Sequence, residues 1–353
     1  MPTRNRAQLL PFALDSALAQ TYGNIEIIIS NNASTDATDS FLSQVKDPRV
    51  RVVRTEAVLP FHEHWRFLLG HANGNYVVFL CDDDAFVPEA ISRGMQAMND
   101  TGLDLVCWRW AFFSHETRAV RFGLGTDVPH RASAESTAQL LLNGDFSAVK
   151  PQLNNCLILR SELTAMIDSF PYAFSPFGGD FATAIYLLGT RKEYVVIDRP
   201  LSIFSLWRGS LSYAVESLDH AAVDDYMTKA GGYPPMPIEM PLHYLPLLAN
   251  RIFSNLRAAA LAIPTAAGLK WNPTLYFLVA WNEIVASFDS ENNRQRFRQT
   301  LDQFPSVRTY VLNHLGSKTS FQKKIAPRGV RHRAFVQRIE RSAYTRVKCI
   351  GIF

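Results

Sequence analysis

The sequence lacks long apolar runs and has few cysteines. The longest uninterrupted apolar run, Leu275–Trp281, has seven residues, whereas a transmembrane helix needs about 20. The four cysteines form no CxxC pair, which is typical of a reducing compartment. Gln8, Pro11 and Asp15 interrupt the apolar N-terminal stretch, which is unlike a secretory signal. These absences predict a cytoplasmic protein without a membrane-spanning segment.

The composition is that of a globular protein with an uneven charge. Of 353 residues, 47% are hydrophobic and 19% charged, which excludes disorder, collagen and coiled coil and suggests one large or two modest domains. Residues 321–353 hold nine Lys or Arg and one acidic residue, Glu340, whereas the rest of the chain holds 27 basic and 31 acidic residues. The sequence therefore predicts a mildly acidic body with a basic tail.

The first hundred residues alternate between helical and strand patterns. Apolar residues at helical spacing predict helices over about 6–21 and 63–71, and Asp36 supplies N-cap chemistry for a third over 36–45. Short β-branched or apolar runs predict the strands Ile25–Ile29, Val50–Arg54 and Tyr76–Cys81. Strands and helices in alternation predict an α/β fold, with a mostly parallel central sheet flanked by helices.

The pattern changes in the second half of the chain. Strand-like runs at 105–108, 157–159 and 194–197 accompany a helix at 182–188, and a stretch rich in Tyr, Pro and Met follows at 226–246. Helical patterns then cover 244–261 and 275–288. We expect one domain over 1–215 and a helical C-terminal extension over 216–353 that ends in the basic tail.

Polar clusters follow two of the predicted strands. Asn31 and Asn32 come directly after the first, and the carboxylates Asp82, Asp83 and Asp84 come directly after the third. Parallel sheets bind ligands at the carboxyl ends of their strands, and oxygen ligands of this kind suit Mg²⁺ or Mn²⁺. The simpler alternative is an N-cap cluster for the helix that opens at Pro88.

These segments resemble a known family. The runs PTRNR (2–6), AQTY (19–22), IIISNNASTD (27–36) and GNYVVFLCDDDAFVP (74–88) are similar in order and spacing to family 2 glycosyltransferases with the A-type nucleotide-diphospho-sugar transferase fold. The likeness is dense over 1–100, fades through about 210 and is absent beyond. It implies a catalytic domain over 1–215, with a nucleotide-binding half (1–100) and an acceptor half (101–215).

The resemblance assigns the nucleotide contacts. Pro2 and Thr3 correspond to the loop under the nucleotide base. Asn32 stands where the family usually has an Asp that hydrogen-bonds the base; an amide both donates and accepts, so the choice of base can differ while binding is kept.

The resemblance also places the metal motif. Cys81 replaces the family's frequent first Asp, Asp82 falls near the ribose and phosphates, and Asp83 is the metal ligand with Asp84 beside it. Asp82 and Asp84 as the metal pair remain an alternative. A bound Mn²⁺ or Mg²⁺ would neutralise the leaving nucleoside diphosphate.

A base for the acceptor hydroxyl is expected in the second half. In the family a carboxylate that opens a helix takes this role, with inversion at the sugar, and Asp180 after Gly178-Gly179 is the match. A plain N-cap is the alternative for Asp180. Trp207–Ser210 is compatible with a phosphate or acceptor contact, and equally with a plain loop.

One departure concerns the start of the chain. The family begins with a buried strand immediately before the Pro-Thr loop, and Met1 stands where its last residue would be. The resemblance thus implies an N-terminally truncated copy of the domain, through either a late start codon or decay.

The sequence as a whole predicts a metal-dependent inverting glycosyltransferase of polysaccharide biosynthesis. It would move a sugar from a UDP- or dTDP-sugar to a hydroxyl of a glycan or lipid-linked acceptor. The alternative is a non-catalytic, decayed glycosyltransferase-like protein that binds nucleotide or acts as a scaffold. In the tail, basic residues interleave with Val330, Phe335 and Ile339. A solvated charged helix is the default interpretation, and an amphipathic segment in peripheral contact with the inner membrane face is the alternative. We expect no nucleic-acid partner.

Overall fold

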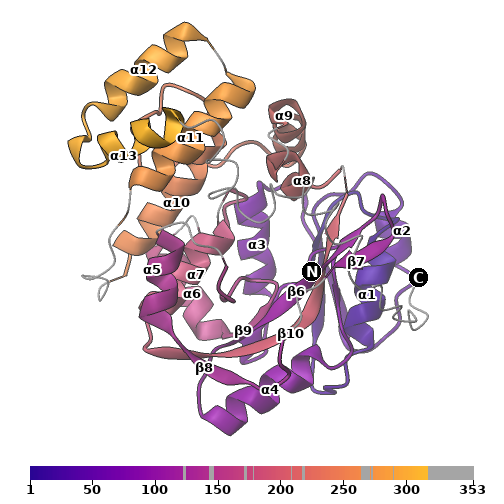
Figure 1. Cartoon of the computed structure of the whole chain (residues 1–353). Helices are drawn as coiled ribbons and strands as arrows, with labels where there is room; N and C mark the ends of the chain where they lie inside the picture. The colour runs from indigo at the N-terminus through magenta and orange to yellow at the C-terminus, as the bar shows by residue number, and fades with distance from the viewer. Residues whose placement is uncertain are drawn as a thin grey trace.

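The computed structural model describes residues 1–121, 125–142, 147–170, 173–177, 179–207, 209–216, 219–263, 271, 273–288 and 290–316. Two β-sheets form the middle of the molecule, and helices cover them, with the last helices gathered on one side (Figure 1). This arrangement confirms the predicted α/β class and the helical C-terminal region. The predicted basic tail, Gly178 and Arg208 lie outside the described residues.

The first sheet is parallel, as predicted. It contains β1 (Pro2–Thr3), β2 (Ile27–Asn31) and β3 (Val50–Arg54) in the order β1-β2-β3. All five residues of β2 are buried. The helices of this half are α1 (Leu10–Leu18), α2 (Thr38–Leu42) and α3 (Phe61–Gly70), and α1 and α2 are shorter than expected.

Residues 1–3 continue the ladder beside β2. The Met1 amino group donates to the Ile28 carbonyl oxygen at 2.8 Å, and the Ser30 N–H donates to the Met1 carbonyl at 2.9 Å. Burial lowers the pKa of this amino group to about 5. The sheet therefore brings Pro2 and Thr3 level with Ser30 and Asn31, at the end of β2.

The second sheet mixes both strand directions. Its order is β4-β9-β6-β10-β5, with β7 beside β6 and β8 beside β10. The long strands β6 (Val106–Ser114) and β10 (Glu193–Leu206) pair in parallel, and the short strands pair antiparallel. The short strands are β4 (Tyr76–Val77), β5 (Ala85–Phe86), β7 (Ala119–Arg121), β8 (His130–Ser133) and β9 (Cys156–Leu159).

The strand predicted over 76–81 is shorter in the structure. Only Tyr76–Val77 forms a regular ladder, with β9. The Phe79 N–H instead donates to the Leu153 carbonyl oxygen at 2.9 Å. The buried Phe79 and Leu80 side chains keep this segment in the core, because their apolar burial does not need a continuous ladder.

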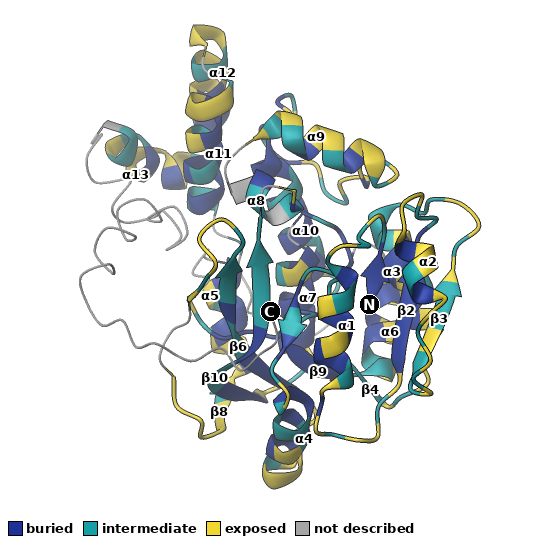
Figure 2. Ribbon diagram, turned by 90° about the vertical axis from the view of Figure 1, so that its right-hand side faces the viewer, coloured by how far each residue is buried: buried dark blue, intermediate teal, exposed yellow. Residues whose placement is uncertain are grey.

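The remaining helices cover the second sheet and build the C-terminal side. They are α4 (Ala90–Thr101), α5 (Ala134–Leu142), α6 (Arg160–Ser169), α7 (Gly179–Gly189), α8 (Leu211–Glu216), α9 (His220–Lys229), α10 (Leu248–Leu261), α11 (Pro273–Ser287), α12 (Glu291–Leu301) and α13 (Pro305–Gly316). Exposed residues gather on the outward faces of α4, α9 and α12, whereas β2 is buried (Figure 2). No helix of the described part combines the length and the apolar character needed to cross a bilayer.

Two main clusters of buried apolar side chains hold these layers together. The smaller joins α1 and α4 to β2, β6 and β10. The larger extends from α3 through α5, α6 and α7 to α10, α11, α12 and α13. The C-terminal helices thus pack on the same core as α7, the helix that begins at the predicted catalytic carboxylate.

Candidate active site

A cavity of about 770 Å³ lies where the ends of β1, β2 and β10 meet the start of α7 and one side of α9. Every residue predicted to act at the site contributes to its wall: Pro2, Thr3, Asn32, Asp82, Asp83, Asp84 and Asp180. These positions come from both predicted halves of the domain. The fold therefore brings the proposed nucleotide, metal and base positions to one place.

Polar residues after β2 fix the loop that follows β1. The Asn5 side-chain carbonyl accepts the Thr35 N–H at 2.7 Å, and the Asn5 N–H donates to the Ser34 hydroxyl at 2.9 Å. Asp36 accepts the N–H of Ala7 at 3.1 Å. Asn5 has a φ of 55°, a left-handed conformation that Asn tolerates better than most residues. The two motif segments 2–7 and 31–36 thus stabilise one another.

The side chain of Asn32 is mostly occupied by the protein itself. Its amide nitrogen donates to the Leu59 carbonyl oxygen at 2.9 Å. Its amide oxygen accepts the Leu59 N–H at 2.8 Å and the Thr55 hydroxyl at 3.0 Å. The residue is only 4% exposed. Only one N–H of the amide therefore remains for a ligand.

Asp82 faces the loop after β1. The Arg6 guanidinium lies 3.8 Å from its carboxylate. Burial, followed by the charge of Asp83, raises the pKa of Asp82 to about 7. The Arg6 guanidinium also lies 4.9 Å from the centre of the Trp207 ring, so this cation contacts both a carboxylate and an aromatic ring of the cavity wall.

Asp83 and Asp84 are oriented by the end of β10. The Trp207 indole N–H donates to Asp83 at 3.0 Å, and the Ser205 backbone N–H donates to Asp84 at 2.9 Å. Burial and the neighbouring Asp83 charge raise the pKa of Asp84 well above its usual range. One oxygen each of Asp83 and Asp84 and the Cys81 sulfur all lie within 4.8 Å of one another. This donor set fits a divalent cation, whose charge would relieve the carboxylate repulsion.

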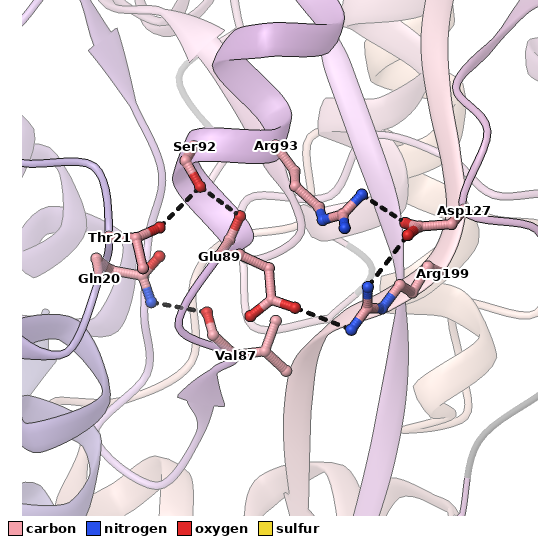
Figure 3. Close-up of polar contacts among 8 residues, drawn as sticks. All are labelled: Gln20, Thr21, Val87, Glu89, Ser92, Arg93, Asp127 and Arg199. Carbon is pink, nitrogen blue, oxygen red and sulfur yellow. Dashed lines mark hydrogen bonds and ion pairs between the residues drawn. The ribbon is translucent and has the colours of Figure 1, made fainter.

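The far end of the carboxylate segment is anchored by Gln20 (Figure 3). Its amide nitrogen donates to the Val87 carbonyl oxygen at 2.8 Å, and its amide oxygen accepts the Ile91 N–H at 3.1 Å. Close by, Arg199 of β10 bonds Glu89 at 2.8 Å. The turn after α1, the start of α4 and β10 thus hold the C-terminal end of the segment that carries the three carboxylates.

Asp180 lies in the first turn of α7 and opens on the cavity. Its side chain is exposed to the cavity, and desolvation by the surrounding walls still raises its pKa to about 6, while the positive charge of Lys150 opposes this rise. Lys150 is 2% exposed, and its ammonium lies 5.3 Å from the Trp110 ring centre and 5.4 Å from that of Phe181. Sequence reasoning missed Lys150, because a single lysine in a mixed pattern carries no signal.

An aromatic wall formed by Trp110, Phe112 and Phe204 was also missed. The Trp110 and Phe204 rings stack at 5.2 Å, and Phe112 meets Phe204 edge-on at 6.2 Å. All three are half-buried cavity residues. Gln152 and Asn154 also line the cavity, and their side-chain oxygens lack a hydrogen-bond partner within the described structure. These aromatic residues lie at alternate positions in the sequences of β6 and β10. They form one surface only because the two strands pair in parallel, which places Phe204 opposite Phe112.

Comparison with known proteins finds a family match over part of the chain and a fold likeness over most of it. Residues 1–145 match the family described as glycosyl transferase family 2. The chain is 36% identical over 85 residues to the Escherichia coli UDP-Glc:alpha-D-GlcNAc-diphosphoundecaprenol beta-1,3-glucosyltransferase WfaP, an alignment that covers 24% of this chain and 34% of the relative. It is 32% identical over 103 residues to the Campylobacter jejuni GalNAc(5)-diNAcBac-PP-undecaprenol beta-1,3-glucosyltransferase, covering 28% and 33%. The chain thus spans about a third of these relatives.

A solved structure extends the likeness over nearly the whole chain. The crystal structure of S. aureus TarS 1–349 in complex with UDP-GlcNAc has a TM-score of 0.53 and 12% identity, and the match covers 98% of this chain and 91% of TarS 1–349. At this identity the likeness concerns the fold alone. It includes the C-terminal helices, which the family match does not reach.

Proposed function

We propose that this chain, whose residues 1–145 match the family described as glycosyl transferase family 2, is a metal-dependent inverting glycosyltransferase. It transfers a sugar from a UDP- or dTDP-sugar to a hydroxyl group of a glycan or lipid-linked acceptor. The observation that carries this proposal is the convergence of seven residues, chosen from sequence, on one cavity of about 770 Å³. A cavity of this size is in the range of small-ligand sites.

The donor side of the cavity is formed by the loop after β1 and the carboxylate segment. Pro2 and Thr3 contact the base, and Asp82 lies near the ribose and phosphates. Asp83 and Asp84 hold Mn²⁺ or Mg²⁺, and Arg6 adds a second positive charge against the phosphates. When bound, the divalent cation supplies positive charge that stabilises the leaving nucleoside diphosphate.

The acceptor side is formed by the start of α7 and the aromatic wall. Asp180 accepts the proton of the acceptor hydroxyl as its oxygen attacks the anomeric carbon. A pKa near 6 keeps this carboxylate mostly ionised at pH 7 and still basic enough to act. Trp110 and Phe204 offer apolar ring faces to the C–H face of a sugar.

A lipid-linked acceptor is favoured by the names of the relatives. The WfaP and Campylobacter enzymes are both named for acceptors on diphosphoundecaprenol or PP-undecaprenol. Such an acceptor is held in a membrane, so the enzyme works at the cytoplasmic membrane face. Peripheral contact through the basic tail over 321–353 fits this location by charge.

The test is calorimetric titration of the full chain with UDP, dTDP and GDP, each with Mn²⁺ and with EDTA. We expect one nucleotide to bind, only with Mn²⁺, and Asp83→Ala to abolish this binding. Asp100→Ala, an exposed change in α4, is the matched control and should bind normally. Metal-independent binding without hydrolysis of the corresponding nucleotide-sugar would favour the non-catalytic alternative, and no binding by the folded protein would refute both.

A further inference from the structure

Cys81 belongs to the donor set of the proposed cation site. Its sulfur and one oxygen each of Asp83 and Asp84 lie within 4.8 Å of one another. Asp82, which follows Cys81 in the sequence, pairs instead with Arg6 at 3.8 Å and is not part of this donor set. Within the segment 81–84, Asp82 therefore pairs with Arg6, whereas the Cys81 thiol lies beside the two carboxylates of the proposed cation site.

We propose that the Cys81 sulfur is the third protein ligand of the divalent cation, with Asp83 and Asp84, and that it shifts the metal preference of this enzyme away from Mg²⁺. The inference rests on the proposed function, which supplies the cation and its place. The cation favoured in the donor complex would thereby be of the soft or borderline kind, such as Co²⁺, Zn²⁺ or Cd²⁺.

The contacts around the site support a ligand role for this sulfur. Trp207 and Ser205 of the β10 end each donate one hydrogen bond to a carboxylate, Asp83 and Asp84 respectively. Partners of this kind fix the orientation of metal ligands from outside the site. The Cys81 sulfur lies within 4.8 Å of one oxygen of Asp84. Its half-buried position on the cavity wall makes it accessible to a small ion.

The other described cysteines are different. Cys107 and Cys156 are fully buried in the larger apolar core and do not line the cavity. Buried thiols in apolar surroundings act as small hydrophobic groups. Among the described cysteines, only Cys81 has its sulfur within 4.8 Å of two carboxylate oxygens that also lie within 4.8 Å of each other.

Coordination would replace the S–H bond by a sulfur–metal bond, and the thiol proton would leave to solvent. Thiolate is a soft ligand that Zn²⁺ and Cd²⁺ accept well and Mn²⁺ tolerates, whereas Mg²⁺ prefers oxygen alone. Replacing the sulfur by a carboxylate would give the oxygen-only set that the resemblance led us to expect. The preference for Mg²⁺ should then return.

The experiment uses Co²⁺, because a cobalt–thiolate bond gives a charge-transfer band in the near ultraviolet. The full chain is titrated with Co²⁺, alone and with UDP, while absorbance and binding heat are both recorded. We expect the band in the wild type, its loss in Cys81→Ser, and its persistence in the matched core variant Cys107→Ala. In Cys81→Asp, a second variant that keeps a metal ligand, the ratio of Cd²⁺ to Mg²⁺ affinity should fall at least about tenfold.

The outcomes separate this inference from the proposed function. If Co²⁺ binds with UDP but gives no band, or if the band survives in Cys81→Ser, the thiol ligand is refuted while the metal-dependent transferase stands. If no divalent cation binds to the folded wild type, both are refuted. A band that depends on Cys81, together with the changed metal ratio in Cys81→Asp, supports the inference.

Discussion

Replacing Asn32 by Asp should destabilise the protein, although the resemblance places an Asp at this position. The Asn32 amide donates to the Leu59 carbonyl oxygen at 2.9 Å and accepts from the Leu59 N–H and the Thr55 hydroxyl. An ionised aspartate in its place would keep the two acceptor contacts but lose the donor. It would also bring a charged oxygen against a carbonyl oxygen at a site that is 4% exposed.

The magnitude follows from the lost donor and the buried charge. Leaving a buried charge without compensation costs about 3–5 kcal/mol, and about 4 kcal/mol corresponds to a pKa of the introduced carboxyl about three units above its ordinary value of about 3.9. Because the folded-state pKa is raised, the loss is small below pH 4 and grows as pH rises to about 7. We therefore expect Asn32→Asp to lower the free energy of unfolding by about 1.5 kcal/mol at pH 5 and about 4 kcal/mol at pH 8.

Urea denaturation at pH 5 and pH 8 measures both values. Asn24→Asp is the matched control, because Asn24 is exposed, and it should change the free energy of unfolding by less than about 0.5 kcal/mol at either pH. A stability of Asn32→Asp equal to that of the wild type at pH 8 would refute the reasoning. So would a loss that is larger at pH 5 than at pH 8.

Three further predictions concern catalysis and the frame of the site. Asp180→Asn should lower kcat by about 10²–10⁴ without weakening UDP binding. The wild-type kcat should fall about tenfold between pH 7 and pH 5, because the base must be ionised and its pKa is about 6. A flat pH profile would contradict this role. Trp110→Ala should raise KM for a diphosphoundecaprenol-linked sugar by up to about tenfold, while calorimetry finds unchanged UDP affinity. Gln20→Ala removes the bonds to Val87 and Ile91 and should lower the free energy of unfolding by about 2 kcal/mol in urea, whereas the control Gln96→Ala should not.

Local sequence patterns were sufficient for the nucleotide half of the fold. The β-branched run before Asn31 predicts a buried strand, and β2 is buried at all five positions. The carboxylates Asp82, Asp83 and Asp84 were predicted as site residues because they directly follow the apolar run 76–81, which ends in the core. These features depend on residues close together in the chain, where periodicity and strand-end chemistry are direct signals.

The helical boundaries and the second sheet depended on contacts between distant segments. The run 76–81 has the composition of a regular strand, yet Phe79 bonds to Leu153 instead of continuing the ladder. The short antiparallel strands around β6 and β10 have no distinct pattern of their own. Their pairing is decided by which segments the two long strands bring beside them.

By itself, the sequence determined the class of the fold, the order of the proposed nucleotide-binding motifs and the candidate site residues. Tertiary structure alone decided what each of them touches. It turned Asn32 toward Leu59 and Asp82 toward the loop after β1, grouped Cys81 with Asp83 and Asp84, and put Lys150 near Asp180. The physical reason is that strand ends and helix starts are local properties, whereas hydrogen-bond partners, desolvation and charge neighbours come from segments that only folding brings together.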